Sequence, residues 1–279
     1  MRIITSEQII NAVENLVLDA SFYLCKDVLE ALIKAKEKEK SPVAHEILKQ
    51  IIKNARIAAN EMVPICQDTG IAVIFLEFGN QVKFEGNIYK AINEGVRQGY
   101  NKGYLRKSIV NNPIDRINTG DNIPAIIHTE FVEGDKIKIT FVPKGGGSEN
   151  MSKLKMLKPA DGIEGISQFV IDTVKSAGAN ACPPVIVGVG VGGSFEKCAI
   201  LAKKALLRPI NDTNENLEFA KLEEEILVRV NSLGIGAQGL GGSQTALAVK
   251  IETYPCHIAS LPVAVNLNCH VSRHKEIVI

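Results

Sequence analysis

Residues 184–206 read PVIVGVGVGGSFEKCAILAKKAL, and their pattern indicates which kind of fold to expect. The short apolar run at 185–189 predicts a buried strand, and the helical spacing of apolar residues over 195–207 predicts a helix. The glycines between them favour a turn in which strand and helix pack closely. A strand that leads directly into a helix indicates a protein in which helices and strands share one core.

The rest of the sequence predicts helices first and a mixture afterwards. Thr5 and Gln8 fit a capping box, and Pro42 fits the first turn of a helix. Two apolar segments flank Glu133-Gly134-Asp135, which predicts a β-hairpin. Helices are expected at 88–103, 163–176 and 217–233, and strands at 71–78, 125–131, 136–142, 246–251 and 259–265. We therefore expect an α+β or mixed α/β fold, as one domain over 1–279 with a helical N-terminal region over 1–62 and a mixed α/β region over 63–279.

Composition excludes several classes of protein. The chain has 279 residues with a formal net charge of +1, so no strong overall field attracts nucleic acid or an anionic membrane. Its apolar runs are much shorter than the roughly 20 residues that a membrane span requires. The six cysteines are dispersed along the chain, which is not the pattern of a small disulfide scaffold. These features favour a reducing compartment, and we expect a cytoplasmic protein.

One glycine pattern offers a function of a different class. Gly188, Gly190 and Gly193 satisfy the G-x-G-x-x-G spacing of dinucleotide-binding proteins, between an expected strand and an expected helix. A nucleotide-dependent oxidoreductase is therefore an alternative. No second strand–helix–strand unit follows, however, and the required acidic residue would have to be Asp212 in a loop. The structural interpretation is that these glycines allow close packing.

The cysteines are ambiguous when each is considered by itself. Cys66 begins the run Cys-Gln-Asp-Thr-Gly, which an ordinary turn also explains. Cys182 precedes two prolines, and Cys-Pro occurs in iron–sulfur loops. The C-terminal run around Cys269 is rich in histidine, so zinc is a competitor, although paired short spacings are missing. Cys25 and Cys198 lie in helical apolar patterns and are expected to be core residues.

Five segments together carry a family resemblance. They are ICQDTG at 65–70, GYLRKSIV at 103–110, PKGGGSEN at 143–150, NACPPVIVGVGVGG at 180–193 and GIGAQGLGGSQTALAVKIETYPCHIASLPVAVNLNCH at 234–270. In this order they closely resemble the alpha subunit of class I, iron–sulfur-dependent fumarate hydratases and of the related L-tartrate dehydratases. The resemblance covers essentially the whole chain.

The resemblance implies a [4Fe–4S] cluster held by three cysteine thiolates, at the positions of Cys66, Cys182 and Cys269. Three ligands for four irons leave one iron without a protein ligand. Such an iron can act as a Lewis acid on a substrate hydroxyl and carboxylate. A non-catalytic iron–sulfur sensor is an alternative, but the presence of the family's substrate-site residues argues against it.

The same resemblance assigns roles in the elimination of water. Asp68 and His257 match the acid–base neighbourhood, while Gln67, Arg106 and the backbone at Gly146 match substrate-contacting positions. The forked guanidinium of Arg106 suits a substrate carboxylate. The proton next to the carboxylate is removed by Asp68 or by a threonine of a partner chain.

A partner is implied because single-chain members of the family carry a second domain that supplies further substrate contacts. This sequence has no counterpart of that domain after Cys269. The resemblance therefore predicts a beta subunit, an active site completed by it, and an α2β2 assembly. The expected reaction is the reversible hydration of fumarate to L-malate, with dehydration of L(+)-tartrate as the alternative.

Overall fold

The computed structural model describes residues 2–279, which form helices and strands in two compact units. Unit 1 comprises residues up to 25, 54–146 and 273–279, and unit 2 comprises 26–53 and 147–272. The fold class is mixed, as expected. The units do not follow the expected division near residue 62, because the N-terminal helical region contributes to both of them.

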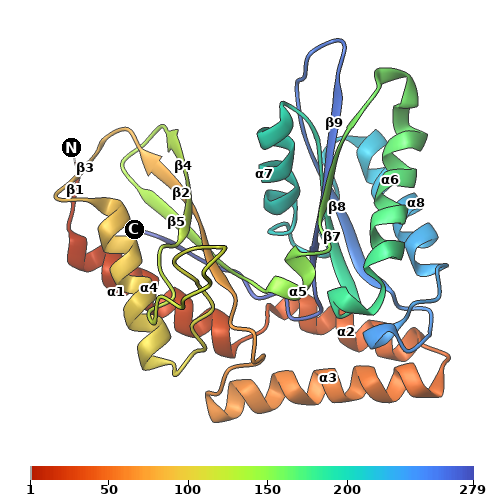
Figure 1. The fold of residues 1–279 in the computed structure, drawn as a ribbon, viewed down its shortest axis with the longest axis horizontal. Helices are drawn as coiled ribbons and strands as arrows, with labels where there is room; N and C mark the ends of the chain where they lie inside the picture. The colour runs from red at the N-terminus through yellow and green to blue at the C-terminus, as the bar shows by residue number, and fades with distance from the viewer. Residues whose placement is uncertain (1) are drawn as a thin grey trace. The chain divides into compact units, whose positions relative to one another are not determined.

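Unit 1 contains a mixed sheet that is covered on one face by two helices (Figure 1). Apolar residues of the sheet, such as Ile74 and Phe141, pack with Val13 and Val96 of the two helices. The four-stranded sheet has the order β10-β5-β2-β4, and a parallel pair β1-β3 lies apart from it. The elements are β1 (Arg2–Ile4), α1 (Ser6–Phe22), β2 (Ile71–Gly79), β3 (Val82–Phe84), α4 (Ile88–Lys102), β4 (Ile126–Val132), β5 (Ile137–Lys144) and β10 (Lys275–Val278).

Unit 2 is a four-stranded sheet with helices on both faces. The sheet has the order β6-β9-β7-β8, with β7 parallel to β8 and antiparallel to β9. Helices α6 and α8 cover one face, and α7 covers the other (Figure 1). The elements are α2 (Lys26–Lys38), β6 (Lys153–Leu157), η1 (Pro159–Asp161), α6 (Gly162–Ala177), η2 (Gly178–Ala181), β7 (Val185–Gly192), α7 (Phe195–Ala205), α8 (Leu217–Asn231), η3 (Ala237–Gly239), β8 (Ala246–Tyr254) and β9 (Leu261–Asn268). Two further helices, α3 (Pro42–Glu61) and the short α5 (Gly146–Glu149), contain two of the chain's four passages from one unit to the other; the other two lie at 25–26 and 272–273.

Local signals predicted most elements correctly, and two predictions were wrong. The Thr5–Gln8 capping box is present, and α3 begins at Pro42. The hairpin is absent, because β2 lies between β4 and β5 and pairs with both of them. Cys25 lies between α1 and α2 rather than inside a helix, and its thiol donates to the carbonyl of His274 at 3.3 Å.

The glycines of the strand–helix stretch have a packing role. Gly188 and Gly190 lie inside β7, where a Cβ atom would come within 2.1 Å of the Ala202 carbonyl oxygen and 2.0 Å of the Cys198 carbonyl oxygen. Only glycine permits helix α7 to approach the strand this closely. The two residues therefore do not form a phosphate-binding turn, and Cys198 is a fully buried core residue, as expected.

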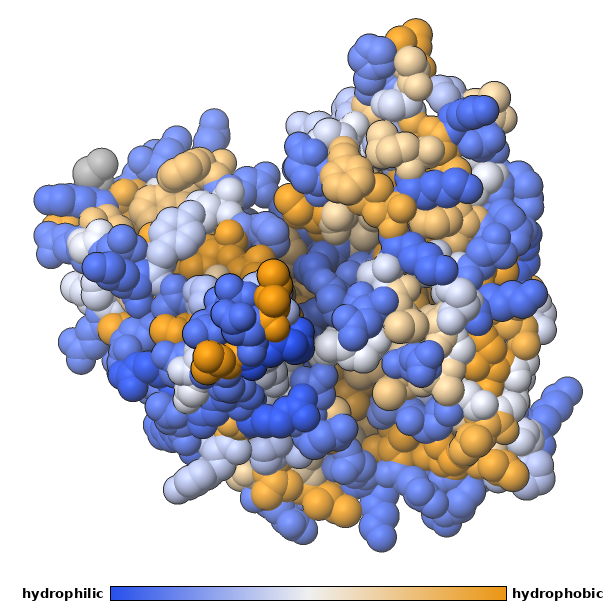
Figure 2. All heavy atoms as spheres, in the orientation of Figure 1, coloured by the Kyte–Doolittle hydropathy of each residue, from blue (hydrophilic) through white to orange (hydrophobic). Residues whose placement is uncertain are grey.

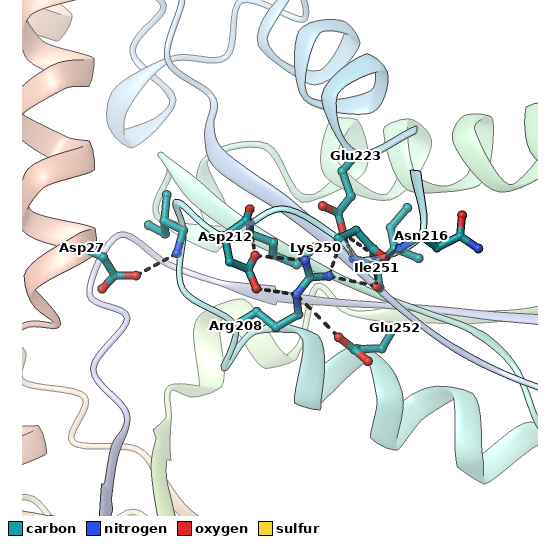
Figure 3. Close-up of polar contacts among 10 residues, drawn as sticks. Asp27, Arg208, Asp212, Asn216, Glu223, Lys250, Ile251 and Glu252 are labelled. Carbon is teal, nitrogen blue, oxygen red and sulfur yellow. Dashed lines mark hydrogen bonds and ion pairs between the residues drawn. The ribbon is translucent and has the colours of Figure 1, made fainter. Parts of the chain in front are cut away.

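Buried and half-buried charged side chains attach the connection between α7 and α8 to strand β8 (Figure 3). The Nη1 of Arg208 donates to Glu223 at 2.8 Å, and its Nη2 and Nε donate to Asp212 at 2.9 and 3.0 Å. The ammonium of Lys250, whose side chain is 4% exposed, donates to Asp212 at 2.6 Å. These charged groups are paired with one another inside unit 2, and they attach the middle of β8 to the α7–α8 connection. Within residues 2–279, no helix is both long enough and apolar enough to cross a bilayer.

Candidate active site

The carboxylate of Asp68 is the centre of a polar cluster in unit 1. Asp68 lies in the turn between α3 and β2, and its side chain is 24% exposed. One carboxylate oxygen accepts from the amide of Gly70 at 3.1 Å and from Arg106 Nη2 at 3.2 Å. The other oxygen accepts from the amide of Gly146 at 2.8 Å. Three residues proposed from sequence, Asp68, Arg106 and Gly146, are thus brought together.

Tyr100 of α4 hydrogen-bonds to the turn that carries Asp68 and holds it in place. The fully buried phenol lies 2.8 Å from the Thr69 carbonyl oxygen and 2.9 Å from that of Gly70. Burial raises the pKa of Tyr100, so its hydroxyl stays protonated and keeps donating. The hydroxyl of Thr69 donates to the carbonyl of Arg106 at 2.6 Å and connects the turn to the loop after α4.

The backbone of Arg106 is held in place, whereas its side chain is exposed to solvent. Its backbone is fixed through Thr69, whereas its side chain is 56% exposed beside Asp68. A guanidinium in this state has donors left for an incoming carboxylate, which its planar fork can bind through two oxygens. Gln67 is exposed in the turn beside Asp68, and its side-chain oxygen accepts from the half-buried Cys66 thiol at 3.5 Å.

Arg273 is a residue of this cluster that the sequence did not reveal. It is 5% exposed, and its Nη2 donates to the backbone carbonyl of Asp68 at 2.8 Å. Its Nε is buried and has no hydrogen-bond partner within residues 2–279. A buried guanidinium nitrogen without a partner is unusual, and a catalytic role or a bound ion is among the explanations for such a group. The only signal in the sequence was a basic residue shortly after Cys269.

Cys182 and Cys269 lie at the same end of the sheet in unit 2. Strands β7 and β9 are antiparallel with Ile186 opposite Asn268, so the residues shortly before β7 and the residue following β9 are neighbours. The ring of His270 confirms this proximity, because its Nδ1 lies 2.9 Å from the carbonyl oxygen of Cys182. Cys182 itself adopts a left-handed conformation, with φ 52° and ψ 62°. Left-handed non-glycine residues are strained and are enriched at functional sites.

His257 is not brought to these cysteines. It lies in the exposed loop between β8 and β9, whereas Cys269 follows the other end of β9. An eight-residue strand separates them by about 25 Å within one chain. The Nδ1 of His257 accepts from the amide of Ala259 at 3.1 Å, which places the proton of the neutral ring on Nε2.

The surroundings of His257 are partly apolar. Figure 2 shows apolar and polar residues side by side where the β8–β9 loop projects from unit 2. The loop borders a pocket of about 400 Å³ that is lined mainly by apolar side chains, including Ile163, Phe219 and Leu261. Such a lining does not suit a dicarboxylate. Cys256 is exposed in the same loop, and its thiol donates to the carbonyl of Ser260 at 3.4 Å.

The cysteines have the chemical form that a metal ligand requires, because none of them is oxidised to a disulfide. All six cysteines lie within residues 2–279, and none of them forms a disulfide. Cys66 belongs to unit 1, and Cys182 and Cys269 belong to unit 2. Among the residues that the structure describes, no three His, Cys, Asp or Glu side chains are already grouped as a metal site.

Comparisons with known proteins give the family. The family model described as "Fumarate hydratase (Fumerase)" matches residues 10–278. A Methanocaldococcus jannaschii protein, provisionally named as the alpha subunit of L(+)-tartrate dehydratase, is 46% identical over 274 residues, covering 95% of each chain. The L(+)-tartrate dehydratase alpha subunit of Escherichia coli O157:H7 is 33% identical over 257 residues, covering 91% of this chain and 84% of the relative. The resemblance expected from the five segments is confirmed, and this chain belongs to the fumarate hydratase (Fumerase) family of hydro-lyases.

Proposed function

We propose that this chain is the alpha subunit of a cytoplasmic [4Fe–4S] hydro-lyase that adds water reversibly to a four-carbon dicarboxylate. The observation that carries the proposal is the cluster of Arg106, Gly146 and Asp68, in which a carboxylate is held by two backbone amides and an exposed guanidinium. This arrangement can bind one carboxylate and present another as a base. Family membership supports the hydro-lyase reaction.

We assign Cys66, Cys182 and Cys269 as the ligands of the cluster. Thiolates are the ligands that such clusters take, and two of the three cysteines lie at the ends of neighbouring strands in unit 2. Cys182 is exposed, and Cys66 and Cys269 are half-buried. The donor set therefore fits the cluster chemically. When bound, the cluster would supply a Lewis-acid iron for the hydroxyl that leaves the substrate.

The protein's own groups have the remaining tasks. Arg106 binds a substrate carboxylate through its fork, and the exposed amide of Gln67 donates a further hydrogen bond. Asp68 accepts the proton from the carbon next to that carboxylate, or orients a threonine of the partner that does so. The amides of Gly70 and Gly146 fix the two carboxylate oxygens of Asp68, which keeps its orientation constant during the transfer.

The substrate is either fumarate with L-malate or L(+)-tartrate. We propose fumarate hydration first, since the family model is that of fumarate hydratase. Tartrate is the second candidate because several relatives are named for L(+)-tartrate dehydratase. The two reactions share the loss of a hydroxyl beside a carboxylate. Tartrate keeps a second hydroxyl, so the product of its dehydration is an enol that becomes oxaloacetate.

We propose that a beta subunit completes the active site in an α2β2 assembly. The names of the relatives as alpha subunits support a partner of this kind. The decisive experiment is an anaerobic assay of the co-expressed alpha and beta chains, after iron and sulfide loading, with fumarate, L-malate, L(+)-tartrate and D-tartrate. Formation of malate from fumarate supports the first candidate, and activity with L(+)-tartrate alone supports the second. A fully loaded complex that is inactive with all four would contradict the proposal.

A further inference from the structure

The glycine-rich segment 234–242 forms a loop that contacts the residues around Cys182. Its central residue, Gln238, has a left-handed backbone with φ 55°. Its amide donates to the carbonyl of Pro183 at 2.8 Å, and its side-chain Nε2 donates to the same oxygen at 3.1 Å. Gln238 therefore holds the residue that directly follows Cys182 with two donors from a single residue.

The side chain of Gln238 also reaches His270. Its Nε2 lies 3.2 Å from the Nδ1 of His270, and that Nδ1 lies 2.9 Å from the Cys182 carbonyl oxygen. A carbonyl can only accept, so the shorter contact places the ring proton on Nδ1. The contact between this nitrogen and the Gln238 amide nitrogen then joins two donors, and it is a packing contact rather than a hydrogen bond. Gln238 and His270 thus hold the two successive carbonyls of Cys182 and Pro183. The residue next to Cys269 is part of the same arrangement.

The loop has a firm anchor elsewhere in unit 2. One oxygen of the buried Glu39 carboxylate accepts from the amides of Ser243 and Gln244 at 2.8 and 3.2 Å. The other oxygen accepts from the amides of Lys40 and Ser41, both at 2.9 Å. Burial acts to raise the pKa of Glu39, but these donors outweigh it and lower the pKa, so the carboxylate remains an ionised acceptor.

At one point the loop lies so close to the segment before Cys182 that a side chain would not fit between them. Gly239 has φ 77°, and a Cβ atom there would lie 2.4 Å from the Cβ of Ala179. The carbonyl of Ala179 in turn accepts the amide hydrogen bond of Cys182 at 2.9 Å. Glycine is required at this contact, and the loop packs directly against the turn that carries the cysteine.

We propose that Gln238 is a positioning residue for the Cys182 ligand: it holds Cys182 in its left-handed conformation so that the thiolate is aimed before the cluster binds. An L-residue adopts this conformation only when its surroundings enforce it. The hydrogen bonds from Gln238 and His270 to the carbonyls of Pro183 and Cys182 stabilise this conformation, and Glu39 fixes the loop that carries Gln238. The role in cluster binding rests on the proposed function, whereas the effect on Cys182 does not.

Substitutions at Gln238 can separate the contribution of its side chain from that of its backbone. Gln238→Gly keeps the left-handed backbone and its amide but removes the side-chain donor. Gln238→Glu keeps the size and replaces the donating amide with a carboxylate. Gln81→Gly and Gln81→Glu are matched controls, because the exposed Gln81 lies in the turn between β2 and β3, outside the proposed site and its anchor. Gln238→Asn, which tolerates a left-handed backbone but has a shorter side chain, tests the reach of the amide.

Two measurements test the role of Gln238. The first is the rate at which a chelator removes iron from the anaerobically loaded alpha–beta complex, together with the electron paramagnetic resonance spectrum of the reduced cluster. Groups that orient metal ligands typically contribute 10–100-fold to metal affinity, so the Gln238 variants should lose iron about tenfold faster and have an altered spectrum. The Gln81 variants should match the unchanged chain in both readouts.

The second measurement is the rate of iodoacetamide labelling at Cys182 in the complex without iron, resolved by peptide mass spectrometry. The Gln238 variants should change this rate several-fold, with no change at Cys256 as the internal reference. Equal iron loss, spectra and Cys182 labelling across all variants would overturn the inference. If the unchanged complex never binds a cluster, the proposed function fails, and the labelling rates alone then decide whether Gln238 positions Cys182.

Discussion

At the scale of single residues, Asp68 is the side chain whose environment is most specific. Both of its oxygens accept from backbone amides, and Arg106 adds a third donor. An amide at this position would direct an NH₂ group at one of these donors and could not act as a base. We expect Asp68→Asn to lower kcat by roughly 10²–10⁴-fold while iron and sulfide content stay unchanged. The exposed Asp115→Asn is the control, and near-normal kcat in Asp68→Asn would exclude Asp68 from the proton transfer.

Arg106 should determine affinity for the substrate more than the rate of proton transfer. Lysine keeps the charge but not the two-pronged geometry, and glutamine loses both. We expect Arg106→Lys to raise KM about tenfold and Arg106→Gln to raise it further, since a charged hydrogen bond contributes about 1.5–3 kcal/mol. Steady-state kinetics over a range of fumarate or tartrate concentrations measures this. The exposed Arg116→Lys, in the same loop, should leave KM unchanged.

Residues that act through their surroundings were not predictable from the sequence. Asp68, Arg106 and Gly146 were found because they lie in recognisable motifs. Arg273 and Gln238 were not, since their roles come from contacts with the backbone carbonyls of Asp68 and Pro183, far away in the chain. No local pattern encodes which distant carbonyl a side chain will meet.

At the scale of elements, the turn between α2 and α3 is connected to the glycine-rich loop by one buried carboxylate, Glu39. Its pKa is lowered in the folded chain, so its contribution is present above the ordinary value of 4.5 and is lost as the pH falls through the folded value. We expect Glu39→Gln to lower the free energy of unfolding by about 1–3 kcal/mol at neutral pH, and by less in acid. Denaturant unfolding at both pH values measures this. Glu37→Gln, at an exposed position of helix α2, should have little effect at either pH.

Element positions were largely predictable, whereas strand pairing was not. Apolar periodicity located the helices and most strands because it depends on neighbours within one turn or one strand. The hairpin prediction failed because β2, distant in sequence, inserts between β4 and β5. The short strands β1, β3, β6 and β10 were missed, since three to five residues carry too little pattern. Pairing of this kind is decided by long-range packing, which a single sequence does not display.

At the scale of the whole molecule, the proposed ligands are distributed over two units. Cys182 and Cys269 lie at the ends of neighbouring strands of one sheet, and Cys66 lies in the other unit beside Gln67 and Asp68. Unit 2 thus contains two of the proposed thiol ligands, and unit 1 contains the third together with the carboxylate and the arginines. Sequence spacing could not group these cysteines; the family resemblance did.

The position of His257 leads to a prediction about the assembly. His257 and Cys269 lie at opposite ends of β9, so they cannot serve one active site from the same copy of the chain. If His257 takes part in catalysis, as the resemblance implies, a second alpha chain in α2β2 must supply it.

Complexes that contain only the His257→Asn chain or only the Cys269→Ser chain should each be inactive. After the two alpha variants are co-expressed with the beta chain, mixed assemblies should regain about a quarter of normal activity, because half of the pairs are mixed and each holds one intact site. A double variant co-expressed with the unchanged chain is the control for dilution. Mixed assemblies that remain inactive, with pairing verified by differential tags, would remove His257 from the active site.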